Sequence, residues 1–171
     1  QYWVYKKSTT QIAKLCNINR RTLQYWMEKF DISRRSCGEG HHLAKVNHCF
    51  LTIRMKEFIN GELLGDGNLT SQSKYSARYQ HVSKYQKYCQ FIANTLSTCG
   101  IKQLGRFYKR YHIKNDCYDY TYFSRDYEEL LSIRQRWYPE GKKLIPRDLK
   151  LTPLTCRQWY IGDGCLVHPK Y

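Results

Sequence analysis

The stretch FINGELLGDGNL at residues 58–69 decides the fold, because its core returns as QWYIGDGCL at residues 158–166. In both copies an apolar helical run ends in Gly-Asp-Gly, which places Asp66 and Asp163 at the C-terminal ends of two helices. A carboxylate is unfavourable there, since the helix dipole is negative at that end and the last carbonyls lack partners. A divalent cation neutralises both, and Mg²⁺ prefers hard oxygen ligands of this kind. The repeat therefore predicts that each acid takes part in metal binding.

Glycines in the first copy predict close contact between helices. Gly61 and Gly65 are one helical turn apart and leave a bare stripe on the helix surface. A second helix can pack tightly against such a stripe, and glycine also lets a neighbouring backbone approach closely.

The two copies resemble the LAGLIDADG family of homing endonucleases, with residues 59–67 and 156–164 in the place of the family motif. The second copy departs from it by placing Gln158 where a small interface residue is usual. The resemblance implies that the motif helices pack side by side at the centre of a monomeric, pseudo-twofold molecule. It also implies that Mg²⁺ or Mn²⁺ is bound by Asp66, Asp163 and the carbonyls of Gly65 and Gly162. Each acid would take part in cleaving one DNA strand.

The composition favours a polyanionic partner. The net charge is +15, from 29 Lys and Arg against 14 Asp and Glu, and 16 Tyr are scattered among the basic residues. This combination suits double-stranded DNA better than a membrane surface. No apolar run reaches membrane-spanning length and no signal-peptide pattern opens the chain. We therefore expect an intracellular protein, in the cytoplasm, the nucleoid or an organelle matrix.

Residues 8–32 are typical of a helix-turn-helix. Ser8 and Gln11 form a capping-box pair before a first helix over residues 11–15, and Asn17 takes the turn position before a second helix over residues 20–30. The expected small core consists of Ile12, Ala13, Cys16, Ile18, Leu23 and Trp26. The candidates for contact with a major groove are Arg20, Arg21, Gln24 and Tyr25.

From the first motif onward the pattern predicts helix, hairpin, helix, hairpin, helix and then the second motif helix, which opens with Thr152 as N-cap and Pro153 in its first turn. This is an α+β protein, with the αββαββα half-domain of the LAGLIDADG family. The expected divisions are the helix-turn-helix at 1–35, a linker at 36–50, the first unit at 51–150 and the start of a second unit at 151–171. We expect that this second unit is truncated in the sequence.

The resemblance implies a four-stranded sheet that lies along the major groove with its polar face on the DNA. Alternation assigns opposite faces to successive residues of a strand. We expect hairpin turns at residues 71–73 and 115–116. The strand residues expected on the DNA face are Lys74, Ser76, Arg78, Gln80, Tyr108, Arg110 and His112.

Hydrolysis of DNA needs a deprotonated water and neutralised phosphate oxygens, and carboxylate-bridged metals can supply both. No side chain is an evident general base. Among basic groups that could assist the chemistry, Arg125 is the first candidate and Lys84 the second.

We interpret the full protein as a site-specific endonuclease that makes a Mg²⁺-dependent staggered double-strand break at a long site, as in mobile introns and inteins. Two alternatives use the same fold: a regulator that binds DNA without cleaving it, and a maturase that binds intron RNA. The 171-residue chain itself is expected to bind one half-site without cleaving it.

Overall fold

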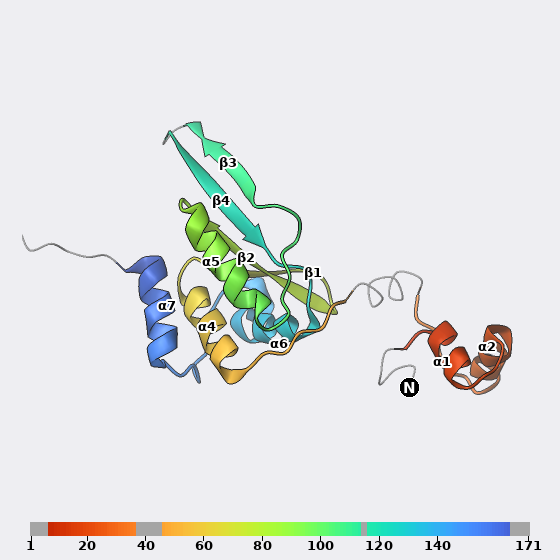
Figure 1. The fold of residues 1–171 in the computed structure, drawn as a ribbon. Coiled ribbons are helices and arrows are strands. Elements are labelled where there is room, and N and C mark those ends of the chain that lie inside the picture. Colours follow the sequence, from red (N-terminus) through yellow and green to blue (C-terminus); the bar gives the residue numbers. More distant parts are fainter. Residues whose placement is uncertain (1–6, 37–45, 114–115, 165–171) are drawn as a thin grey trace, which may run out of the picture. The chain divides into compact units, whose positions relative to one another are not determined.

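The computed structural model describes residues 7–36, 46–113 and 116–164. These residues belong to two compact units, one within residues 1–45 and the other within residues 46–171 (Figure 1). No helix in the described ranges is long and apolar enough to cross a membrane.

The first unit contains the expected pair of helices, α1 (Thr9–Leu15) and α2 (Arg20–Lys29). The capping box is present: Ser8 Oγ accepts from the Gln11 backbone N–H at 3.2 Å, and the Ser8 N–H donates to Gln11 Oε1 at 2.8 Å. Asn17 has a φ of 50° in the turn between the helices. Asparagine adopts this left-handed conformation more readily than most residues, which agrees with the expected turn.

The small core of this unit differs from the expected one. Trp26 is 46% exposed and Cys16 is also exposed, whereas Met27 is only 4% exposed. The inward face of α2 is formed by Leu23 and Met27, which are one turn apart. Because successive helical residues are about 100° apart, burying Met27 turns Trp26 toward solvent.

The second unit contains helices and strands in the expected order. They are α4 (Ile53–Leu64), β1 (Asn68–Ser73), β2 (Ser76–Ser83), α5 (Gln86–Ser97), β3 (Tyr108–His112), β4 (Cys117–Phe123), α6 (Glu128–Trp137), the short 3₁₀ helix η2 (Pro139–Gly141) and α7 (Pro153–Asp163). This confirms the α+β class.

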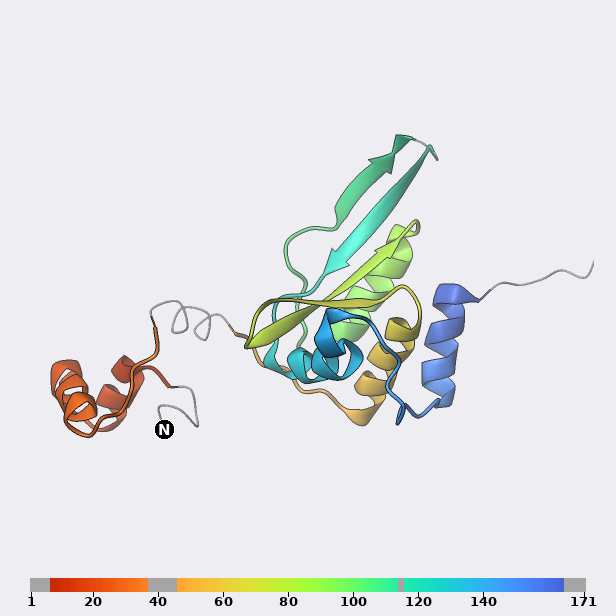
Figure 2. The same cartoon turned by 180° about the vertical axis from the view of Figure 1, so that it is seen from behind.

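The strands form one antiparallel sheet in the order β1-β2-β4-β3. Helices α5 and α6 pack on the same face of it, where Tyr79 and Tyr122 share a core with Ile92 and Leu130. The β3–β4 hairpin extends beyond α5 (Figures 1 and 2). The other face carries no helix of the described ranges in either view, which leaves it open to a ligand.

The predicted position of the first hairpin turn needs correction. Residues 71–73 lie within β1, and the turn is formed by Lys74 and Tyr75. Ser71 Oγ donates to the carbonyl of Ser76 at 2.6 Å, which ties the strands together and moves the turn outward. In the second hairpin Asp116 has a φ of 45°, and Asn115 lies outside the described residues.

Residues 46–50 are not a linker. The Phe50 N–H donates to the carbonyl of Cys99 at 3.0 Å, and the Cys49 N–H donates to Glu129 Oε2 at 3.1 Å. This segment therefore packs against the second unit. The rest of the expected linker after Ser36 lies outside the described residues until Val46.

Candidate active site and DNA-binding face

The two motif helices begin in the same way. Thr52 Oγ1 accepts from the Met55 N–H at 3.1 Å at the start of α4, and Thr152 Oγ1 accepts from the Thr155 N–H at 3.2 Å at the start of α7. Pro153 occupies the first turn of α7, as expected. Each cap satisfies an orphan backbone donor and fixes where its helix starts.

Glycine permits direct contact between α4 and α7, which lie side by side in both ribbon views (Figures 1 and 2). A methyl group placed on Gly61 would lie 2.5 Å from the carbonyl oxygen of Thr155, closer than two non-bonded atoms can stand. A methyl group on Gly65 would lie 3.4 Å from Gly162 Cα. The expected glycine stripe is thus the seam between the motif helices.

This seam brings the two motif acids to one place. Asp163 Oδ1 lies 3.5 Å from the position of a methyl group on Gly65, and the Asp66 backbone nitrogen lies 3.5 Å from the same position on Gly162. Both acids are exposed to solvent. The two solvent-facing acids therefore lie at neighbouring positions where the helices end.

Lys143 lies beside these acids, which the sequence did not indicate. Its Nζ donates to the carbonyls of Gly65 at 3.0 Å and Gly67 at 2.9 Å. Burial lowers the pKa of Lys143, and the negative charges of Asp163 and Asp66 oppose this shift. The lysine thus places a cation at the carbonyl end of α4, where the helix dipole favours positive charge.

The donor set fits a hard divalent metal. Within the described residues, no cluster of three or more His, Cys, Asp and Glu side chains forms a complete metal site. Asp66 and Asp163 would supply two carboxylates, and the Gly65 and Gly162 carbonyls could add neutral oxygens. Mg²⁺ commonly binds through one or two carboxylates and keeps several waters, so two exposed acids suffice for it. The carbonyl of Gly65 has a second lone pair beside the one that Lys143 engages.

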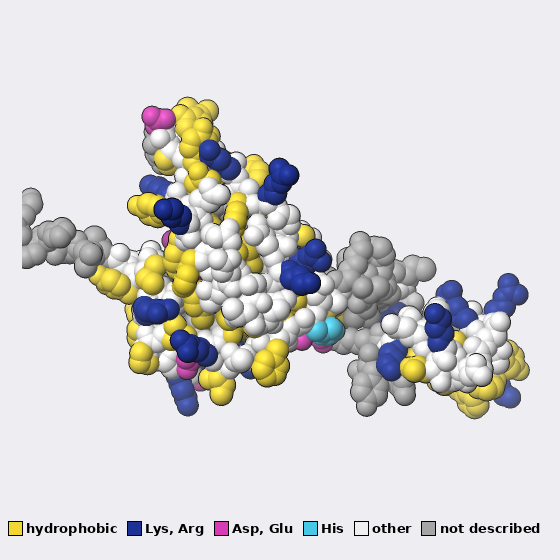
Figure 3. Space-filling model, in the orientation of Figure 1, with side chains coloured by type: hydrophobic (Ala, Val, Ile, Leu, Met, Phe, Trp, Pro, Cys, Tyr) yellow, Lys and Arg dark blue, Asp and Glu magenta, His cyan; other side chains and the backbone are white. Residues whose placement is uncertain are grey.

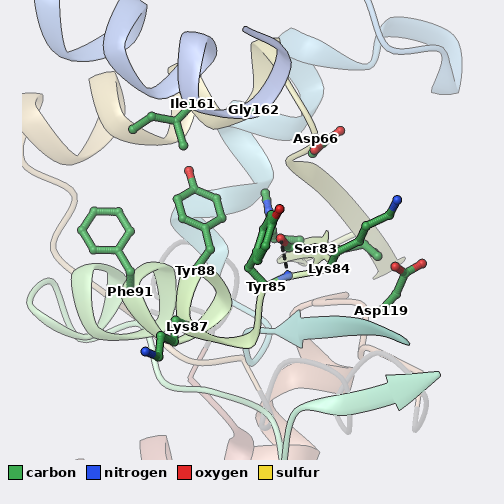
Figure 4. A pocket seen from close by; sticks show the side chains of 12 residues that line it. Asp66, Ser83, Lys84, Tyr85, Lys87, Tyr88, Phe91, Asp119, Ile161 and Gly162 are labelled. Carbon is green, nitrogen blue, oxygen red and sulfur yellow. Dashed lines mark hydrogen bonds between the residues drawn. The ribbon is translucent and has the colours of Figure 1, made fainter. Parts of the chain in front are cut away.

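A cleft of about 910 Å³ opens next to Asp66. Its walls include Tyr85, Tyr88 and Lys84 on one side and Gly162 on the other (Figure 4). Lys84, the second basic candidate, therefore lines the same cleft as Asp66.

Arg125, the first basic candidate, is not at the site. Its backbone N–H donates to the carbonyl of Lys102 at 2.9 Å, just beyond the C-terminal end of α5. Asp66 faces the opposite end of α5, near Tyr88. A helix of 12 residues is about 18 Å long, which is farther than an arginine side chain reaches.

The sheet register confirms most of the expected strand phase. In the antiparallel ladder Gln80 pairs with Phe123, Tyr108 with Thr121, and Arg110 with Asp119. Paired residues share a face. The residues that lie together on the open face are Arg78, Gln80, Tyr108, Arg110 and His112.

Four of the residues that we expected on the DNA face either lie elsewhere or are engaged by other side chains. Lys74 lies in the turn, and Ser76 is only 5% exposed. The Arg78 guanidinium pairs with Asp126 at 2.7 Å, and His112 Nε2 lies 2.6 Å from Asp119 Oδ2. On the open face, Asp126 thus holds the Arg78 side chain in an ion pair, and Asp119 engages the His112 ring.

On α2 the residues expected to contact DNA point largely outward. Arg20, Arg21 and Tyr25 are exposed, and Gln24 is half-buried. Lys and Arg side chains are visible on the surfaces of both units, with few Asp and Glu among them (Figure 3).

A sequence model of the LAGLIDADG DNA endonuclease family matches residues 56–170. This chain belongs to that family. It is also 29% identical over 172 residues to an uncharacterized protein of Methanocaldococcus jannaschii, and this alignment covers 99% of the chain and 65% of the relative. The chain thus spans about 65% of that relative's length. The LAGLIDADG match contains both motifs, whereas the first unit lies outside it.

Proposed function

We propose that this protein is part of a LAGLIDADG homing endonuclease that makes a staggered double-strand break at a long DNA site. The proposal rests on the contact between the ends of α4 and α7, which brings Asp66 and Asp163 together beside Lys143. A protein that only binds DNA has no electrostatic reason to place two carboxylates where phosphates approach.

In this function each residue at the seam has a distinct role. Asp66 and Asp163 would hold Mg²⁺ or Mn²⁺ with help from the Gly65 and Gly162 carbonyls, one acid for each DNA strand. A bound divalent metal supplies a more acidic water and neutralises the charge on the phosphate. Lys143 holds the carbonyls of Gly65 and Gly67, just after α4, in place and would add a fixed positive charge where negative charge develops on the phosphate.

Duplex DNA would lie along the open face of the sheet. Gln80, Tyr108 and Arg110 lie on this face and can contact base edges or phosphates. The first unit would add a second contact through α2, whose Arg20 and Arg21 are exposed at the start of the helix. A single chain with two motif helices needs no partner subunit to assemble the pair of acids, which supports a monomer.

The test is cleavage of a randomised duplex library by the full-length protein with Mg²⁺, with Asp66→Asn and Asp163→Asn as variants. We expect cleavage at one long site in the wild type and its loss in both variants, while DNA binding persists. Tight specific binding without cleavage in the wild type would refute the endonuclease and favour a regulator. Preferential binding of structured intron RNA over the duplex would favour a maturase.

A further inference from the structure

Glu62 is a buried carboxylate in the middle of the first motif, one turn before Asp66. It is 2% exposed and is the only Asp or Glu that is buried among the described residues. Its Oε1 accepts from the hydroxyl of Tyr88 at 2.6 Å, and its Oε2 accepts from the hydroxyl of Tyr79 at 3.1 Å. His81 Nδ1 lies 3.2 Å from the same Oε2. The carboxylate thus connects α4 with β2 and α5.

Gln158 connects this carboxylate to α7. With its amide nitrogen toward Glu62, Gln158 donates to Oε1 at 3.0 Å, while its oxygen accepts from Arg157 Nη2 at 2.8 Å. Gln158 is 1% exposed. A methyl group on Gly61 would lie 2.7 Å from Gln158 Cβ, so the glycine provides the space through which the glutamine reaches Glu62. The bulky Gln158 of the second motif therefore fits the first motif, where Gly61 leaves space for it and Glu62 accepts its hydrogen bond.

Hydrogen bonds to a buried carboxylate are directional, whereas the apolar packing contacts along the glycine seam are not. Apolar contact tolerates sliding of one helix along another, because burial of area has no preferred direction. A buried carboxylate must keep its donors, since an unpaired one is costly. A single buried polar residue can fix the register of two packed helices for this reason. Within the described residues, two side-chain hydrogen bonds join α4 and α7. Thr155 Oγ1 donates to the carbonyl of Glu57 at 3.2 Å, and Gln158 donates to Glu62, which makes it the bond that ends on a buried carboxylate.

We infer that Glu62 and Gln158 are positioning residues: their hydrogen bond sets the register of α7 on α4, and thereby the separation of Asp66 and Asp163. This inference rests on the proposed endonuclease function, because the separation of the acids matters through the metals they would hold. Both residues are buried, so neither would contact the reacting phosphate. Their effect on cleavage passes through the two acids.

The experiment compares two variants of the full chain, each of which removes one hydrogen bond to Glu62. Gln158→Met removes the donor on α7, and Tyr79→Phe removes a donor on β2 that does not touch α7. Hydrogen exchange of the amides of α7 reports its attachment to α4, and a Mn²⁺ titration followed by electron paramagnetic resonance reports the acids. Gln158→Leu removes the same donor and serves as a second variant should Gln158→Met not fold.

We expect Gln158→Met to speed exchange in α7 by about tenfold and to weaken Mn²⁺ binding by about 10-fold to 100-fold, the usual effect of losing a residue that orients metal ligands. Tyr79→Phe should leave both quantities within about twofold of wild type, and Gln158→Leu should behave like Gln158→Met. Equal effects of Gln158→Met and Tyr79→Phe would overturn the inference, as would no effect of Gln158→Leu. If the wild type binds no Mn²⁺ while exchange still separates the variants, the register role is supported and the endonuclease function is refuted.

Discussion

Replacing Gly61 by alanine tests the packing of the two motif helices most directly. In an ordinary helix interior this change stabilises a protein by about 1 kcal/mol, because alanine has the higher helix propensity. At this position the added methyl group would stand 2.5 Å from the carbonyl oxygen of Thr155 and 2.7 Å from Gln158 Cβ. The seam therefore predicts the opposite sign.

The magnitude follows from the distances. Ordinary contact between non-bonded atoms needs about 3.5 Å, so α7 must move away from α4 by about 1 Å along this contact. Overpacking of this kind costs about 1–3 kcal/mol. With the gain in propensity subtracted, Gly61→Ala should destabilise the protein by up to about 2 kcal/mol, which lowers the melting temperature by up to about 8 °C in a chain of this size. A displacement of about 1 Å between catalytic groups costs about 100-fold in rate.

Thermal unfolding followed by circular dichroism measures the first effect, and single-turnover cleavage by the full-length protein measures the second. Gly65→Ala is the matched control, because its methyl group would meet Gly162 Cα at an ordinary 3.4 Å. It should change the melting temperature less than Gly61→Ala does. A rise in melting temperature for Gly61→Ala would show that α4 and α7 do not touch at this residue, and the reasoning would fail.

Three further predictions follow from the site and its surroundings. Lys143→Met should lower the single-turnover cleavage rate by about 10²–10³ while the Kd for DNA changes little, since loss of one fixed charge at the transition state has an effect of this size; an unchanged rate would assign the lysine to structure alone. Burial raises the pKa of the Cys49 thiol to about 12, so that only about one thiol in 10⁴ is ionised at pH 8, and iodoacetamide labelling with mass mapping should find Cys16 and Cys156 modified long before Cys49. Burial raises the pKa of Glu129, but hydrogen bonds from its own N–H, Cys49 and His48 outweigh this and leave it below 4.5. Its contribution to stability is present above pH 4.5 and lost as pH falls through the lowered pKa, so Glu129→Gln should lower the melting temperature at pH 7, and this difference should shrink as the pH falls through that pKa.

Local signals in the sequence predicted the elements that depend on local chemistry. The start of α7 follows from Thr152 and Pro153, which act within one turn. The open face of the sheet follows from alternation, which placed Arg110 and Gln80 correctly because a strand has no other period. Ser76 was misplaced because it follows the turn directly and its burial depends on how the hairpin closes.

The rest of the site depends on how distant segments meet. Lys143 reaches the end of α4 from the connection between α6 and α7, and nothing in its own surroundings in the sequence marks it as a neighbour of Asp66. Arg125 was misplaced for the converse reason, since it follows a strand that ends far from the acids. Gln158 departs from the motif because it is bulky where a small residue is usual. Its hydrogen bond to Glu62 of the other helix accounts for this residue, and the sequence of one motif alone does not show that bond.

In the proposed DNA complex, the spacing of side chains on the open face would limit how the protein can be given a new target. Tyr108, Arg110 and His112 occupy alternate positions of one strand, and residues on the same face of a strand are about 6.8 Å apart. Base pairs in B-DNA follow one another every 3.4 Å or so. The side chains of one strand can thus contact only every second base pair along the duplex, and side chains of the adjacent strand must contact the base pairs in between. Retargeting by directed evolution will therefore need linked changes on adjacent strands, so libraries that vary one strand at a time will leave every second base pair unaltered.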